Sequence, residues 1–259
     1  KRIKDIYDQG IINWVKLKFC SIQKINSINP KLKTEGAIFS PQTGIIDVPE
    51  LITSLEGDIQ HHGGVISLNT EFIGATKKEG IFDIKCNDGN TFNIKSKNLI
   101  NSAGTSSETV SESIKALAKK HILPIRYAKG HYYKYTGEHP FTSLVYPISD
   151  EFTSGLHVGF DASGQIRLGP SLSWVDNIDF TFDESLKEYF IRSIQKYWPD
   201  LNPDKLHPDY VGIRPKIQNI NEQMKDFSIL HAKDHGVPGL VNIQGIESPG
   251  ITSCLSIGR

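Results

Sequence analysis

The chain has 259 residues, with 29 basic and 29 acidic side chains and 38% hydrophobic residues. That length is enough to bury one large core or two ordinary ones. The balanced charge argues against a dedicated nucleic-acid-binding protein, which normally carries a basic stripe, and no apolar run reaches the roughly 18 residues that a membrane-spanning helix needs.

The cysteines and histidines show no pattern of a disulfide framework or a metal site. Cys20, Cys86 and Cys254 are far apart and odd in number, and neither a CxxC pair nor an HExxH motif is present. No secretory signal precedes the first predicted helix. The sequence therefore predicts a protein of the reducing cytoplasm without a metal. Because the chain begins at Lys1 and stops at Arg259 inside helix-like sequence, we interpret both ends as cut.

The first half of the chain predicts helices and strands in alternation. A short helix over residues 2–9 ends at Gly10, and a second helix begins at Asp47, whose side chain can cap it. A tight turn at Asp88-Gly89 indicates a hairpin. The other predicted elements are strands over 37–40, 65–68, 71–76, 81–86, 91–95 and 98–102 and a helix over 107–120.

The second half is richer in predicted strands. These cover residues 125–135, 143–147, 156–160, 165–168, 227–230 and 240–243, and helices are expected over 182–197 and from Gly250. A composition shift near residue 122 indicates a second layer of structure. The pattern predicts an α/β or mixed α+β fold.

The most informative segment is the last one, from Asn242 to Cys254. A strand runs into a turn that contains Gly245, Pro249 and Gly250, and a helix follows. Glycines allow the backbone to approach a ligand closely, and a helix start offers unpaired N–H groups to an anion or an electron-rich ring edge. The alternative interpretation is a tight strand-to-helix connection with Ser248 as its cap.

Two other segments are candidates for a binding site. In Gly212-Ile-Arg-Pro-Lys216, Arg214 offers a planar fork to a carboxylate and Lys216 adds a point charge. The alternative there is a surface loop with two solvated cations. In Leu99–Thr105 an apolar strand ends in small residues and opens a helix, which suits a cofactor at a sheet edge or is a plain strand–turn–helix.

The histidines are less specific. His157 lies on a strand that is otherwise predicted to be buried, so it is either a catalytic base or a satisfied core histidine. His61 and His62 end a predicted helix, where the dipole favours them without any ligand. The sequence contains neither GxGxxG, nor a P-loop, nor GxSxG, so none of those three sites is predicted.

Taken together, these segments resemble FAD-dependent oxidoreductases of the D-amino-acid-oxidase-like superfamily, and most closely the L-2-hydroxyglutarate dehydrogenase/oxidase group. The similar segments fall in the family's order along nearly the whole chain. They are Phe39–Asp47, Asn101–Gly104, Lys129–Tyr133, Val145–Ile148, His157–Pro170, Gly212–Lys216, Asp226–Ile229 and Gly236–Thr252.

The resemblance implies a partial FAD-binding three-layer domain and a substrate domain with a large mixed sheet. Residues 1–120 would be the remainder of the FAD-binding domain with inserted strands and a helix, 121–210 mainly the substrate-binding sheet, and 211–259 the return to the FAD-binding domain. The family's N-terminal strand with its glycine fingerprint is missing here. Smaller departures are Asn29-Pro30 in place of Glu-Pro and Ser102 in place of Cys.

The resemblance also implies roles for matching residues. Arg214 would face the substrate carboxylate with support from Lys216, and His157 would take the hydroxyl proton while hydride leaves C2 for the flavin. A second cation for a dicarboxylate would be Lys129 or Arg126. The residues that would hold FAD are Ala103 and Gly104 on the pyrophosphate or ribose side and Gly245, Ile246, Gly250, Ile251 and Thr252 at the isoalloxazine and ribityl region.

The implied activity is FAD-dependent oxidation of an L-2-hydroxy acid, with L-2-hydroxyglutarate converted to 2-oxoglutarate and oxygen or a membrane quinone as the electron acceptor. The alternatives are an amino-acid or amine oxidase or a glycerol-3-phosphate dehydrogenase of the same superfamily. A further alternative is a non-catalytic fragment, or one half that needs a partner chain for its missing N-terminal part. We expect a location in the cytoplasm, peripheral at the inner face of the membrane.

Overall fold

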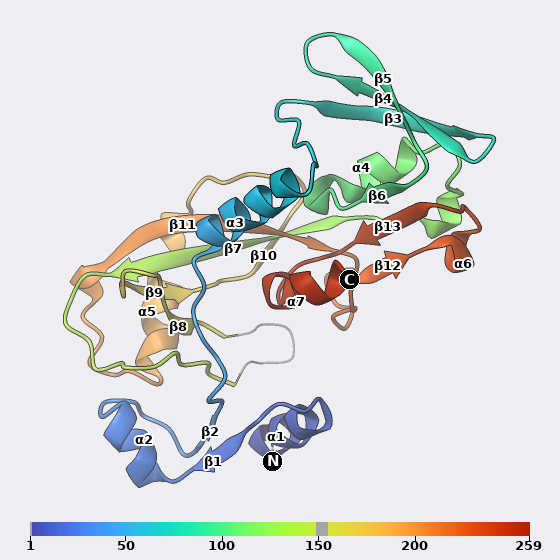
Figure 1. The fold of residues 1–259 in the computed structure, drawn as a ribbon. Coiled ribbons are helices and arrows are strands. Elements are labelled where there is room, and N and C mark those ends of the chain that lie inside the picture. The colour runs from blue at the N-terminus through green and yellow to red at the C-terminus, as the bar shows by residue number, and fades with distance from the viewer. Residues whose placement is uncertain (1, 149–154) are drawn as a thin grey trace. The chain divides into compact units, whose positions relative to one another are not determined.

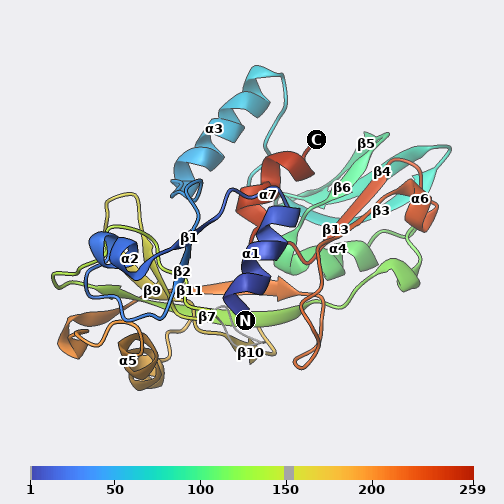
Figure 2. The same ribbon diagram turned by 90° about the horizontal axis from the view of Figure 1, so that it is seen from below.

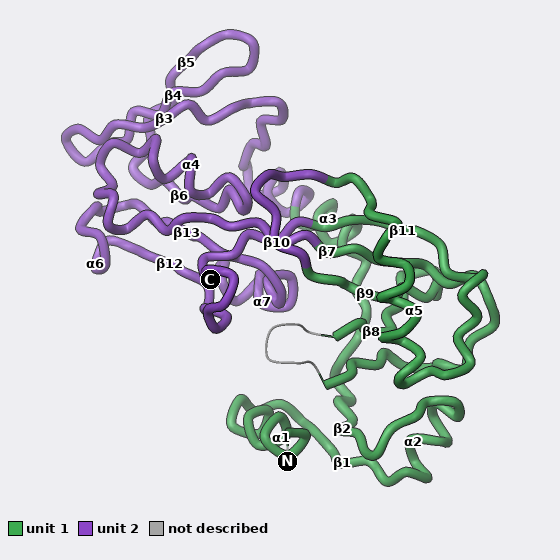
Figure 3. Tube along the Cα trace, turned by 180° about the vertical axis from the view of Figure 1, so that it is seen from behind, with its two compact units in different colours: residues 1–55, 130–172, 180–212 green, residues 56–129, 173–179, 213–259 purple. Residues whose placement is uncertain are grey.

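The computed structural model describes residues 2–148 and 155–259 (Figure 1). The chain divides into two compact units, which Figure 3 shows in different colours. Unit 1 comprises residues 1–55, 130–172 and 180–212, and unit 2 comprises residues 56–129, 173–179 and 213–259. Each unit is therefore assembled from segments that are distant in the sequence. The mixed α/β class predicted from the sequence is confirmed.

Unit 1 is built around an aromatic core. Its elements are α1 (Arg2–Ile12), β1 (Lys18–Cys20), α2 (Ile22–Ile28), β2 (Ala37–Phe39), β8 (His157–Phe160), β9 (Ile166–Gly169) and α5 (Lys187–Gln195). Strands β8 and β9 pair antiparallel. Phe190 of α5 packs on Tyr133, and Trp198 packs on Tyr135 and Phe141 at ring-centroid distances of 4.6 to 5.0 Å. These large rings pack with buried aliphatic side chains in one core, and their burial stabilises the unit.

Unit 2 contains two small sheets. Strands β3 (Glu71–Lys78), β4 (Ile81–Asn87) and β5 (Thr91–Ser96) form an antiparallel sheet, and β12 (Ser228–Leu230), β13 (Leu240–Gln244) and β6 (Leu99–Asn101) form another in that order. Helix α4 (Ser107–Glu112) lies against β3, β6 and β13 (Figures 1 and 2). The remaining elements are β10 (Ser173–Val175), α6 (Ala232–His235) and α7 (Gly250–Ile257).

Three elements belong partly to each unit. They are helix α3 (Val48–His61) and strands β7 (Arg126–Tyr135) and β11 (Leu206–Lys216). Strand β7 pairs with β10, β9 and β11 in one sheet. Its pairs with β10 involve residues 127–129 and its pairs with β9 involve residues 133–134. Strand β7 begins in unit 2 and ends in unit 1, whereas β11 begins in unit 1 and ends in unit 2.

Many of the predicted elements are confirmed. The Asp47 carboxylate accepts a hydrogen bond of 3.0 Å from the backbone N–H of Glu50, as a helix cap should, and α3 follows it. Strands β4 and β5 form the predicted hairpin around Gly89, whose φ is +110°. The predicted strands at 37–40, 71–76, 98–102, 125–135, 156–160, 165–168, 227–230 and 240–243 and the helix at Gly250 correspond to elements of the structure.

Several predictions of elements need correction. Residues 65–68 form no strand, because the Ser67 and Thr70 hydroxyls bond to each other at 2.7 Å across a turn at Asn69, whose φ is +54°. The first helix continues past Gly10 to Ile12. Residues 143–147 contribute only an isolated bridge between Val145 and Val158. The helix 182–197 is confined to a 3₁₀ turn and α5.

The helix predicted over 107–120 ends at Glu112 for a tertiary reason. The backbone N–H of Ala75 on β3 donates to the carbonyl of Ser113, and the N–H of Lys115 donates to the carbonyl of Ala75. These bonds of 3.0 and 2.9 Å compete with continuation of the helix, and they bury Ile114 against β3. Sequence analysis also missed β1, α2, β10 and β11.

No helix in the described part of the chain is long and apolar enough to cross a membrane.

Candidate functional site

The predicted cofactor segments of unit 2 lie at one edge of a sheet. Strands β6 and β13 are parallel neighbours, with Asn101 opposite Asn242. Ala103 and Gly104 follow the end of β6, and Gly245 and Ile246 follow the end of β13. Because the carboxyl ends of parallel strands lie at the same edge, the structure brings these two segments together.

A buried polar network fixes this edge. The Asn101 side-chain amide donates to the Asn242 side-chain oxygen at 2.8 Å and to the Ser111 hydroxyl at 3.0 Å. The side chain of Gln244 holds the backbone of Leu123 with two hydrogen bonds, of 3.0 and 2.8 Å. All four polar side chains are buried. Since buried polar groups are costly unless they are paired, the network ties β6, β13 and α4 into one arrangement.

The turn between β13 and α7 has the backbone that its glycines predict. Gly245 has a φ of +73°, and a Cβ added there would lie 2.8 Å from the Ile217 side chain. Gly250 is the first residue of α7 and is buried. The N–H of Gly250 donates to the carbonyl of Glu247, whereas the N–H groups of Ile251 and Thr252, in the first turn of α7, lack partners inside the helix and are available to a ligand. The turn can therefore bring backbone donors close to a bound group.

Both predicted cations are at the end of β11, in unit 2. Lys216 is buried, with a side-chain exposure of 6%, and its ammonium lies 2.6 Å from a carboxylate oxygen of Glu247. Arg214 is more accessible at 26%, and its guanidinium lies 3.9 Å from the other oxygen of Glu247. The segment is thus the end of a strand with one buried cation, which corrects the alternative of a loop with two solvated cations.

Glu247 is the residue that sequence reasoning missed. Its side chain is 5% exposed, and it stands in the turn between Gly245 and Gly250. The available signal was an acidic residue between Ile246 and Ser248, in a turn otherwise made of apolar, small and proline residues. A buried carboxylate needs a cation, and no pattern in the sequence distinguishes Arg214 from Lys216 as that partner.

The two candidates for a second substrate cation are also in unit 2. Lys129 is buried on β7 and forms an ion pair of 2.7 Å with Asp179, which is half exposed. Arg126, at the start of β7, lines a recess of about 460 Å³ together with Trp174, Asp176 and Glu222. Lys129 is therefore paired with a carboxylate, and Arg126 shares its recess with two.

His157 is the one predicted site residue that belongs to unit 1. It begins β8, where it pairs with Gly169 of β9, and its ring packs against that of Tyr146 at a centroid distance of 4.3 Å. Burial raises the pKa of Tyr146 from its usual value. His157 is half buried, as either interpretation of it from the sequence would allow.

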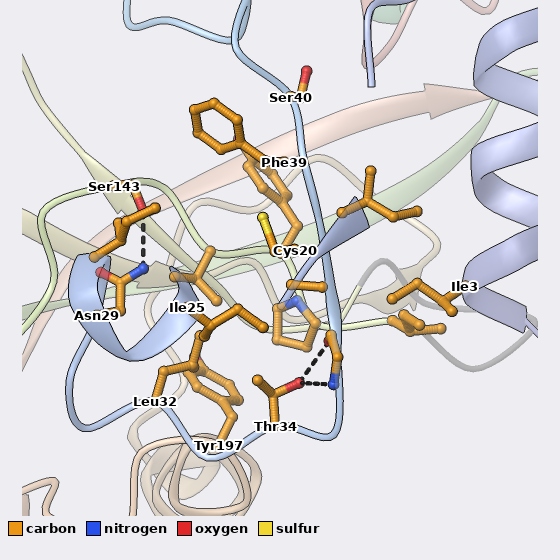
Figure 4. Close-up of a pocket in the computed structure, with 18 of the residues that line it drawn as sticks. Ile3, Cys20, Ile25, Asn29, Leu32, Thr34, Phe39, Ser40, Ser143 and Tyr197 are labelled. Atoms are coloured by element: carbon orange, nitrogen blue, oxygen red, sulfur yellow. Dashed lines mark hydrogen bonds between the residues drawn. The ribbon is translucent and has the colours of Figure 1, made fainter. Parts of the chain in front are cut away.

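Unit 1 also contains a cavity of about 810 Å³ (Figure 4). Its described walls are mainly apolar, and Ile25, Leu32, Phe39 and Tyr197 point into the region that Figure 4 shows. Among its polar side chains, the Asn29 amide donates to the Ser143 hydroxyl at 2.9 Å. No predicted site residue is among the described residues that line it.

Comparison with known proteins identifies the chain's relatives. Residues 3–259 match the family described as FAD dependent oxidoreductase, abbreviated DAO. A mitochondrial L-2-hydroxyglutarate dehydrogenase of Arabidopsis thaliana is 30% identical over 90% of this chain and 56% of its own length. The L-2-hydroxyglutarate dehydrogenase of Escherichia coli K12 is 21% identical over 100% of this chain and 68% of its own length. The chain thus spans a little over half of the Arabidopsis protein.

A solved structure has the same fold. The L-alpha-glycerophosphate oxidase of Mycoplasma pneumoniae, in its reduced form with FAD bound, superposes with a TM-score of 0.81 at 22% identity. The match covers 98% of this chain and 66% of that one. The similarity therefore extends over nearly all of the chain.

Proposed function

Because this chain belongs to the family of FAD-dependent oxidoreductases, we propose that it serves the oxidation of L-2-hydroxyglutarate to 2-oxoglutarate with FAD as the hydride acceptor. The names of the Arabidopsis and Escherichia coli relatives support this substrate. The observation that carries the proposal is the partly exposed Arg214, which is anchored through Glu247 to the turn that starts α7.

The residues of unit 2 fit a flavin. At Gly104 the φ is +56° and an added Cβ would meet nothing within 4 Å, so the chain leaves open space beside the end of β6. The start of α7 supplies backbone donors and the positive end of a helix dipole. Ala103 and Gly104 would hold the pyrophosphate or ribose side. The residues that would hold the isoalloxazine end are Gly245, Ile246, Gly250, Ile251 and Thr252.

The protein's own groups would bind and orient the acid. FAD supplies the hydride acceptor when it is bound. Arg214 would hold the substrate carboxylate with its planar fork, which fixes the orientation of the neighbouring C2–H bond. Lys216 would support Arg214 indirectly, by pairing with Glu247. The role of His157 as the base for the hydroxyl proton stays a prediction.

The test is anaerobic reduction of the protein-bound flavin. We expect L-2-hydroxyglutarate to bleach the flavin absorbance at about 450 nm, and D-2-hydroxyglutarate, which has the opposite configuration at C2, to leave it unchanged. Bleaching by sn-glycerol 3-phosphate or by glycine instead would favour the alternative dehydrogenase or amino-acid oxidase. A folded sample that retains no flavin with excess FAD would support the non-catalytic fragment, or a half that needs a partner chain.

The electron acceptor and the cellular location are part of the same proposal. Oxygen uptake during turnover would identify an oxidase, whereas reduction of a quinone analogue without oxygen uptake would identify a dehydrogenase. We propose a cytoplasmic protein that is peripheral at the inner face of the membrane. Its recovery by salt washing of a membrane fraction would support that location, and its recovery from a periplasmic or extracellular fraction would contradict it.

A further inference from the structure

We propose that Glu247 is a positioning residue that sets the charge of the anion-binding end of the site. It neutralises the buried ammonium of Lys216 and leaves Arg214 as the cation that an anionic group of the substrate meets. This inference rests on the proposed function for the identity of the substrate, although its charge argument applies to any carboxylate.

The two cations differ in how they meet the same carboxylate. The Lys216–Glu247 contact of 2.6 Å joins two side chains that are 6% and 5% exposed. At that distance and burial, the opposite charges interact strongly and largely cancel one another. The Arg214–Glu247 contact is 3.9 Å, longer than a hydrogen bond, and the Arg214 side chain is 26% exposed. Most of the donors of Arg214 are therefore left for a ligand.

The Glu247 carboxylate also links the two cations to the turn between β13 and α7. Glu247 comes two residues after Gly245 and three before the first residue of α7, and its carbonyl accepts a hydrogen bond from the N–H of Gly250. Its side chain therefore ties the end of β11 to the turn that presents backbone donors. The expected consequence is a fixed position of Arg214 relative to the start of α7.

The net charge of these three side chains indicates which kind of anionic group the site accepts. Two cations and one carboxylate leave one positive charge, which matches a carboxylate group. A phosphate dianion would be matched only if Lys216 were released from Glu247. We infer that Glu247 favours a carboxylic acid over a phosphate ester at this end of the site.

The test is a charge-balance series on the purified holoprotein, with binding of 2-oxoglutarate measured by calorimetry. Lys216→Met leaves Glu247 with Arg214 as its partner, so that affinity should fall about tenfold. Glu247→Gln releases both cations, so that affinity should rise about tenfold, and more for sn-glycerol 3-phosphate. The double variant Lys216→Met/Glu247→Gln restores a single free Arg214 and should bind within about threefold of the wild type.

The matched control is Glu112→Gln, which removes an exposed carboxylate from α4 of the same unit. It should leave both affinities unchanged. Thermal unfolding of each variant shows which ones fold. If Lys216→Met alone does not fold, the comparison between the wild type, Glu247→Gln and the double variant still decides the matter.

Weaker binding by Glu247→Gln would overturn the proposal, as would a double variant that stays weaker than the wild type by tenfold or more, because Lys216 would then contact the anion itself. Absence of any 2-oxoglutarate binding to the wild type would also overturn it. Failure of L-2-hydroxyglutarate to reduce the flavin, with the charge series as expected, would reject only the proposed substrate. Reduction of the flavin by L-2-hydroxyglutarate, with a charge series that differs from the expected one, would reject only the role of Glu247.

Discussion

The side-chain amide of Asn101 donates a hydrogen bond of 2.8 Å to the side-chain oxygen of Asn242, in the neighbouring strand of a parallel pair. Both side chains are buried. The same oxygen of Asn242 accepts a bond of 2.8 Å from the Ser111 hydroxyl. The edge at which the cofactor segments meet is therefore held by side chains as well as by the strand ladder.

We expect Asn242→Ala to lower the free energy of unfolding by about 1–3 kcal/mol, because it leaves the buried amide of Asn101 without one of its acceptors. Denaturant unfolding measures this change. The control is Asn93→Ala, which removes an exposed amide that bonds to Asp83 and should cost less than about 0.5 kcal/mol. Equal costs for the two variants would contradict a structural role of the network.

The turn after β13 requires glycine at position 245. Its φ of +73° is unfavourable for other residues, and an added Cβ would lie 2.8 Å from Ile217. We expect Gly245→Ala to destabilise the protein by at least about 1 kcal/mol and to reduce flavin retention after gel filtration. Gly57→Ala, inside α3 and with nothing within 4 Å of the added Cβ, should instead stabilise the protein by about 0.5–1 kcal/mol.

Burial lowers the pKa of His235 below its usual value, and its ring nitrogen accepts a hydrogen bond of 3.1 Å from the N–H of Val237. Between the native pKa and the unfolded value of about 6.5, the unfolded chain binds more protons than the folded one. This contribution to stability is therefore present above about pH 6.5 and is lost as the pH falls.

The check is the free energy of unfolding at about pH 7.5 and pH 5.5. We expect the free energy of unfolding to fall less over this pH interval in His235→Gln than in the wild type. His62→Gln, which changes an exposed histidine just past the end of α3, should leave the fall as it is. An unaltered fall in His235→Gln would show that other groups cause it.

For the proposed reaction, Arg214→Met should raise the KM of L-2-hydroxyglutarate about 10- to 100-fold, since a hydrogen bond to a charged group is worth about 1.5–3 kcal/mol. Steady-state kinetics with a quinone analogue or oxygen as acceptor measures it. Arg192→Met removes an exposed guanidinium that pairs with Glu188 on α5, and it should leave KM unchanged. A similar KM in Arg214→Met and the wild type would remove Arg214 from the substrate site.

The sequence by itself determined the local elements whose signals come from neighbouring residues. Asp47 caps α3 because its carboxylate reaches an N–H three residues on, and Gly89 forms the β4–β5 turn because it tolerates a positive φ. The glycine turn before α7 follows from the same kind of signal, as does the family to which the chain belongs, which its ordered motifs indicated.

Only the tertiary structure decided which distant groups meet. Helix α4 ends at Glu112 because the backbone of Ala75 on β3 forms hydrogen bonds with Ser113 and Lys115. No residue pattern in 107–120 predicts these bonds. Likewise, Lys216 and Glu247 come from different elements, and the burial of both made them partners. Local preferences act over a few residues, whereas the pairing of a buried charge depends on which strands and turns pack together. The partners of Glu247 could therefore be identified only from the tertiary structure.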